Sequence, residues 1–72
     1  MEYGKLRGRI VEVYGKYGEF AKAMGWSRQT LSNKLAHKTE FTQTEILKVC
    51  EVLDIDLADI GIYFFTPRVQ HN

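Results

Sequence analysis

The sequence predicts an all-α protein, a compact bundle of five short helices followed by a short apolar C-terminal tail. Three observations lead to this prediction. Apolar residues recur at the three- and four-residue spacing of a helix face along successive segments. Glycines and N-cap residues such as Ser27 and Asp56 separate these segments. At 72 residues the chain has the length of one domain, over residues 1–72, with a small core.

The first two helices are predicted over residues 5–15 and 18–24. One apolar face runs along the first segment and consists of Leu6, Ile10, Val13, Tyr14 and Tyr17. Gly15 and Gly18 lie close together in the sequence and mark the break between the helices. The second segment directs three residues inward, namely Phe20, Ala21 and Met24. Because alanine is small, the following helix can approach closely at this point.

A third helix is predicted over residues 28–36, after a turn at Gly25. Glycine adopts the left-handed backbone conformation at low cost, which the C-terminal end of a helix often requires. Trp26 is expected to pack into the core, and Ser27 is a suitable N-cap. The two sides of this helix differ: Leu31 and Leu35 face inward, and the polar side consists of Arg28, Gln29, Ser32 and Asn33.

A fourth helix is predicted over residues 43–53, and either Thr42 or Thr44 can begin it. Its apolar stripe consists of Ile46, Leu47, Cys50 and Leu53. The polar loop before it, residues 37–40, separates it from the third helix.

A short fifth helix is predicted after Asp56, with Gly61 at its end. The tail over residues 62–72 begins with four large apolar residues, Ile62, Tyr63, Phe64 and Phe65. We expect this run either to form a homodimer interface or to fold back over the core of its own chain. The second alternative arises because a small core needs every apolar residue available.

Charge is distributed unevenly along the chain. The net charge is only +1, but residues 1–38 hold eight lysine and arginine residues against three acids, a net charge of +5. Residues 39–72 hold two lysine and arginine residues against six acids, a net charge of −4. Because the local field rather than the net charge attracts a polyanion, the first half is compatible with binding to nucleic acid.

Other functional classes find no support in the sequence. No apolar run approaches the roughly 20 residues of a membrane span, and residues 1–5 lack the apolar core of a signal peptide, so we expect a cytoplasmic protein without a membrane partner. Cys50, the sole cysteine, has no disulfide or CxxC partner and is expected to be buried. His37 and His71 belong to no catalytic or metal-binding constellation. We therefore expect no enzyme, cofactor, metal or small-molecule ligand.

Residues 17–36 contain a characteristic set of positions. Ala21 is small at the fifth position, Gly25 occupies the ninth, and apolar residues occupy four others, namely Phe20, Met24, Trp26 and Leu31. This set resembles the helix-turn-helix core of the lambda-type phage repressor and Cro (XRE) family. The resemblance extends over about residues 5–62, and the segments that begin at Phe41 and Leu53 resemble the fourth and fifth helices of small prophage regulators of Gram-positive bacteria. Three places depart from it: Tyr17 replaces the usual glutamine, Lys34 replaces an apolar residue, and Ala36-His37 replaces the frequent Asn-Gly after the third helix.

The resemblance implies a set of DNA contacts. The base-contacting residues would be Arg28, Gln29, Ser32 and Asn33. Arginine can donate two hydrogen bonds to guanine, the amides can pair with adenine, and serine can donate or accept. The phosphate-contacting residues would be Tyr17, Gly18, Ser27, Thr30, Lys34, Lys38, Thr39 and Thr42, by their side chains or by the free N–H groups of helix N-termini.

The function implied by the resemblance is sequence-specific binding of double-stranded DNA. The protein would be a prophage-type transcriptional regulator, expected to be a repressor, that places residues 28–36 in the major groove of a palindromic operator as a homodimer. It would work at the nucleoid of a bacterial cell. The alternative is an antitoxin or another protein-interaction module that uses the same helical fold.

Overall fold

The computed structural model describes residues 3–65 and contains five α-helices, one short 3-10 helix and no strand in that range. The elements are α1 (Gly4–Tyr14), α2 (Tyr17–Met24), α3 (Arg28–Leu35), α4 (Gln43–Val52), η1 (Leu57–Asp59) and α5 (Ile60–Phe64). The predicted all-α fold of five helices is confirmed, and the first four helices lie within one residue of their predicted bounds. None of the described helices is long and apolar enough to cross a membrane.

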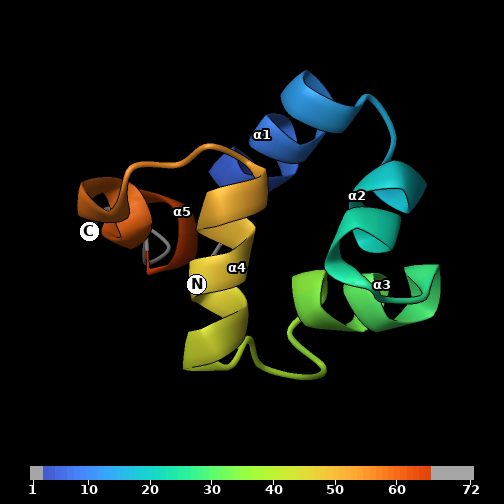
Figure 1. The fold of residues 1–72 in the computed structure, drawn as a ribbon. Helices are drawn as coiled ribbons and strands as arrows, with labels where there is room; N and C mark the ends of the chain where they lie inside the picture. The colour runs from blue at the N-terminus through green and yellow to red at the C-terminus, as the bar shows by residue number, and fades with distance from the viewer. Residues whose placement is uncertain (1–2, 66–72) are drawn as a thin grey trace, which may run out of the picture.

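The helices surround one apolar core. α4 stands in the middle of the view in Figure 1, with α2 and α3 on one side and α5 on the other. α1 packs against both α2 and α5, so the beginning and the end of the described chain meet. The largest fully buried side chains come from every α-helix and from Leu53, the residue after α4; the others are Leu6, Ile10, Phe20, Leu31, Val49 and Phe64. Cys50 is buried as expected, and burial raises the pKa of its thiol.

The connection between α2 and α3 forms as its residue types predict. Gly25 ends α2 in the left-handed conformation, with φ of 78° and ψ of 24°. The amide of Trp26 donates to the carbonyl of Ala21 at 2.8 Å, and Ala21 is buried where α2 meets α3. Ser27 caps α3, because its Oγ accepts from the amide of Thr30 at 3.1 Å. This short turn fixes the direction in which α3 leaves α2.

Lys34 differs from its expected role as an exposed phosphate contact. Its side chain is only 9% exposed, and its Nζ donates to the carbonyl of Glu40 at 3.0 Å and to Oε1 of Glu45 at 2.9 Å. The ammonium also lies 5.2 Å from the ring centroid of Trp26 and 5.8 Å from that of Phe41. The physical reason is that a lysine stem can fill an apolar position while its ammonium reaches buried oxygen atoms. Lys34 therefore ties α3 to the start of α4.

Thr42, rather than Thr44, begins α4 with a capping box. Its hydroxyl accepts from the amide of Glu45, and the Glu45 carboxylate accepts from the amide of Thr42 at 2.9 Å. The same Oε1 atom accepts from Lys34. Partial burial alone would raise the pKa of Glu45, but the hydrogen bonds from Thr42 and Lys34 outweigh it and hold the pKa below its ordinary value of 4.5.

This lowered pKa predicts an acid-sensitive contribution to stability. Because the pKa of Glu45 is lower in the folded state, its contribution is fully present above the unfolded-state pKa and is lost as pH falls through the folded-state pKa. We expect Glu45→Gln to reduce the free energy of unfolding at pH 7 and to flatten its decline in acid, as measured by urea unfolding from pH 7 to about pH 3. Glu51→Gln, which removes an exposed carboxylate from the same helix, is the control. Equal acid sensitivity in the two variants would contradict the prediction.

The end of the fold differs from the prediction at Gly61. Asp56 does begin the segment, since its Oδ1 accepts from the amide of Ala58 at 2.9 Å. However, Gly61 lies inside α5, which continues through Phe64. Phe64 is 2% exposed, and its ring centroid lies 5.3 Å from that of Phe41. The burial of this aromatic ring outweighs the roughly 1 kcal/mol that a glycine costs within a helix.

The four residues of the apolar run do not share one environment. Phe64 is in the core, and Tyr63 is partly buried against it. Ile62 and Phe65 lie at the surface, 46% and 54% exposed. Phe65 lines a mainly apolar groove of about 440 Å³ between α4 and α5, together with Gln43, Ile46, Leu47 and Ile60. The rest of the predicted tail, residues 66–72, lies outside the described residues.

Candidate nucleic-acid interface

The polar side of α3 is at the surface, as the sequence predicts. Arg28, Gln29 and Ser32 are exposed, and Asn33 is partly exposed. Nε2 of Gln29 donates to Oδ1 of Asn33 at 2.9 Å, one helical turn away. The two amides therefore support each other and present a linked pair of hydrogen-bonding groups beside Arg28.

Arg28 lies over the start of α2. Gly18 has no side chain, and an added Cβ there would lie 3.4 Å from Cδ of Arg28. The stem of the arginine therefore rests on the backbone of Gly18. This contact ties the first residue of α3 to the first turn of α2, although the sequence alone indicates no link between these two parts of the interface.

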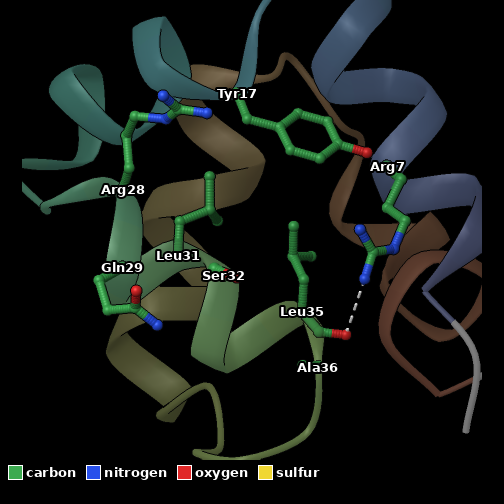
Figure 2. Close-up of a pocket in the computed structure, with 8 residues that line it drawn as sticks. All are labelled: Arg7, Tyr17, Arg28, Gln29, Leu31, Ser32, Leu35 and Ala36. Atoms are coloured by element: carbon green, nitrogen blue, oxygen red, sulfur yellow. Dashed lines mark hydrogen bonds between the residues drawn. The ribbon is translucent and has the colours of Figure 1, made fainter.

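A cavity of about 420 Å³ opens between α1, α2 and α3 (Figure 2). We call it the α3 cavity. Its lining consists of Arg7, Tyr17, Arg28, Gln29, Leu31, Ser32, Leu35 and Ala36. None of these residues is acidic, and two are arginines. A cavity with this lining suits a ligand that accepts hydrogen bonds and carries negative charge.

Arg7 is a member of this site that was not predicted from the sequence. It lies on α1, and its Nη2 donates to the carbonyl of Leu35 at 3.2 Å (Figure 2). In the sequence it is one of several cations in the first helix. The available signal was its position next to buried Leu6 and three residues before buried Ile10, which places it at the edge of the packed face.

A second cavity of about 700 Å³ adjoins the first and shares Tyr17 and Arg28 with it. Lys16 and Lys22 also line it, together with one acid, Glu19. The Glu19 carboxylate lies 3.7 Å from the Lys22 ammonium at the surface, where such a pair contributes little. Three cations against one acid leave this part of the surface positive.

The predicted phosphate contacts lie in different places. Tyr17 and Gly18 begin α2 beside Arg28, and the hydroxyls of Ser27 and Thr30 lie 3.0 Å apart at the start of α3. Three further predicted phosphate contacts are exposed and lie beyond α3. They are Lys38 and Thr39 in the following loop and Thr42 at the N-cap of α4. The structure thus places Tyr17 and Gly18 at the start of α2 next to Arg28, and Ser27 and Thr30 at the start of α3. Lys34 is directed inward.

The described residues offer no arrangement typical of metal chemistry. No group of three or more histidine, cysteine, aspartate or glutamate residues among residues 3–65 is placed to hold a metal ion. His37, one of the two histidines, stacks on Tyr3 with ring centroids 4.5 Å apart, and its φ of 66° places it in the turn after α3. His71 lies outside the described residues.

Comparison with known proteins identifies the family of the chain. Residues 1–67 match the family model described as "protein of unknown function (DUF739)". The chain is also similar to a solved structure, the solution structure of the modulator of repression (MOR) of the temperate bacteriophage TP901-1 from Lactococcus lactis. That likeness has a TM-score of 0.81 and 43% sequence identity, and it covers 90% of this chain and 88% of that chain. A search of curated proteins finds no match. The chain thus has the fold of a small phage regulatory protein, and it belongs to the DUF739 family.

Proposed function

We propose that the protein is a phage-type regulator of transcription that binds double-stranded DNA through the exposed side of α3. The proposal rests on four polar side chains on one side of α3, namely Arg28, Gln29, Ser32 and Asn33. These side chains have the hydrogen-bonding groups that distinguish base pairs in the major groove, and they project from a helix positioned by a rigid turn. A regulatory role is supported by the similarity to a phage modulator of repression.

The charge distribution supports binding of DNA on the same side of the protein. α1, α2 and α3 contain most of the positive half of the chain, and α4 and α5 lie in the negative half. Lys16, Lys22 and Arg28 line one cavity beside the turn, and Arg7 lines the other. A negatively charged duplex would therefore be attracted to the side that carries the base-contacting residues.

On this proposal the protein belongs with the helix-turn-helix regulators of the XRE type and binds as a homodimer to a palindromic operator. Two copies would place their α3 helices in half-sites about 10 bp apart. Within the apolar run, Ile62 and Phe65 are exposed and would contribute to the dimer interface, whereas Phe64 is buried in the core.

The test is selection of bound sequences from random duplex DNA, followed by measurement of affinity against salt concentration. We expect a palindromic consensus, with affinity falling steeply as salt rises. In Arg28→Ala/Gln29→Ala, discrimination should fall by about 1–3 kcal/mol at each base pair that these two side chains recognise. Lys5→Ala/Gln43→Ala replaces a cation and a glutamine at exposed positions elsewhere and should leave the consensus intact. No enrichment at low salt would reject the proposal.

A second candidate is a protein-interaction module that acts on a repressor protein rather than on DNA. The observations that favour it are the name of the similar phage protein, a modulator of repression, and the inward position of Lys34, which leaves Arg28 as the one cation of α3 at the surface. This candidate predicts that the protein changes the affinity of a phage repressor for labelled operator DNA while having no affinity for that DNA itself. Direct, sequence-specific binding by the protein alone would favour the first candidate.

A further inference from the structure

We propose that the surface between α4 and η1 docks a basic amphipathic helix of another protein. The surface centres on a groove of about 460 Å³, which we call the acidic groove and which is lined by Leu47, Cys50, Glu51, Asp54, Ile55 and Leu57. None of these residues lines either cavity beside α3. The inference goes beyond the binding of DNA by α3 and does not depend on it.

Large apolar side chains are exposed on this part of the fold. Leu47 on α4 is 48% exposed, and Leu57, the first residue of η1, is 61% exposed, more than any other large apolar residue in the described range. Cys50 and Ile55 are 2% and 8% exposed and form the floor of the acidic groove. Because contact between leucine and water is unfavourable, a partner that covers both leucines gains free energy from their burial.

The acidic groove adjoins a second apolar surface. Leu47 also lines the mainly apolar groove between α4 and α5, where Phe65 is 54% exposed and no lining residue is charged. Both grooves involve the side of α4 that faces η1 and α5, away from α2 and α3 (Figure 1). A helix that presents apolar side chains three or four residues apart can place one in each groove.

The charge of the acidic groove favours a basic partner. Glu51 and Asp54 are exposed, and no lysine or arginine lines the groove. Among residues 3–65, neither carboxylate takes part in an ion pair. Arg9 approaches Asp54, but its guanidinium donates to the backbone carbonyl of that residue and to the Glu12 carboxylate. Lysine or arginine residues beside the apolar side chains of the partner would therefore meet negative charge that the described fold leaves without an ion pair.

The architecture and the charge favour a helix over other occupants. Residues 3–65 contain no strand, so a partner finds no sheet edge to extend, and the acidic groove lacks the aromatic lining that polyproline segments require. Glu51 and Asp54 would repel a membrane of anionic lipids. A second copy docked by twofold symmetry would bring the same carboxylates towards their counterparts. A partner that also reached Phe65 would compete with the proposed homodimer for that residue.

The first experiment selects a ligand for the groove from peptides of known design. A display library of alanine-rich helical peptides, with random residues along one face, is selected against the wild-type protein. We expect the enriched peptides to carry two large apolar residues three or four positions apart, with lysine or arginine residues beside them. Enrichment of acidic peptides, or of no peptide at all, would overturn the proposal.

The affinity of one selected peptide is then measured by titration calorimetry against matched variants. Leu57→Ala should weaken binding about tenfold, whereas Val11→Ala, which truncates a 49% exposed side chain on α1, should leave it unchanged. Glu51→Gln/Asp54→Asn should also weaken binding about tenfold and flatten its salt dependence, and Glu19→Gln on α2 is its control. Asparagine tolerates the φ of 53° at position 54, so the double variant keeps the backbone. Equal affinities in all variants would overturn the proposal.

NMR locates the bound peptide, and two further measurements test the other occupants. Amide shifts should concentrate in residues 47–57, and shifts concentrated in α3 would contradict the docking surface. If the protein alone sediments as a dimer that Leu57→Ala dissociates, the groove belongs to a second copy and the proposal is wrong. Binding to phosphatidylglycerol vesicles that Leu57→Ala abolishes would assign the groove to a membrane instead. If the peptide binds as expected and no DNA is selected, the proposed function fails while the docking surface stands.

Discussion

Replacing Phe64 by alanine is expected to lower the free energy of unfolding by about 3–5 kcal/mol, a large share of the stability of a domain this small. Phe64 is 2% exposed and contacts two other aromatic rings edge-on, with centroids 5.3 Å from Phe41 and 6.5 Å from Tyr3. Truncation leaves a cavity between α5, the start of α1 and the loop before α4. Those segments cannot close it without moving the helices.

Phe65→Ala is the matched control, because it removes the same side chain from the next position. Phe65 is 54% exposed, so its variant should change the free energy of unfolding by about 0.5–1 kcal/mol at most. Urea unfolding of both variants, followed by circular dichroism, measures the difference. Equal losses in the two variants would show that Phe64 is not a core residue in solution.

Lys34→Ala is expected to cost about 2–4 kcal/mol. The substitution removes two hydrogen bonds, leaves the Glu40 carbonyl without its partner, and deprives the Glu45 carboxylate of its cation. We expect a loss of stability in the lower part of the range known for breaking a buried ion pair, because the Glu45 side chain is 26% exposed. The loss of the lysine stem against Trp26 and Phe41 adds to the cost.

Lys38→Ala is the control for this prediction. It removes an exposed lysine four residues later and should change stability by less than about 0.5 kcal/mol. The comparison also separates two roles of Lys34. If Lys34 contacted a phosphate, its loss would lower the salt dependence of DNA binding with little effect on folding. If Lys34 is buried and joins two helices, its loss lowers the thermal midpoint of the free protein. Unchanged thermal unfolding of Lys34→Ala would contradict the buried position.

The local signals in the sequence were sufficient for most of the fold. Gly25, Ser27 and Thr42 act through their own backbone or through residues at most five positions away, so their effects can be predicted from sequence. The end of α5 could not be predicted in this way. Gly61 favours a break locally, but the outcome depends on Phe64 meeting Tyr3 and Phe41, which are distant in the sequence.

The candidate site shows the same division. The exposed side of α3 follows from helical periodicity, which placed Leu31 and Leu35 inward. The roles of Arg7 and Lys34 depend on contacts 28 and 11 residues away, with Leu35 and Glu45. A charged residue has no strong periodic signal, so only the packed helices reveal which cation lines a cavity and which one is enclosed.

The cluster of Tyr3, Phe41 and Phe64 also has a consequence for the order in which the protein can fold during synthesis. Its members come from the beginning, the middle and the end of the described chain, and α1 reaches its full packing only against α5. Until Phe64 has left the ribosome, the helices that precede it lack the ring that closes this part of their core. The nascent chain therefore exposes aromatic surface until α5 is released, and stable packing of this cluster follows the translation of α5.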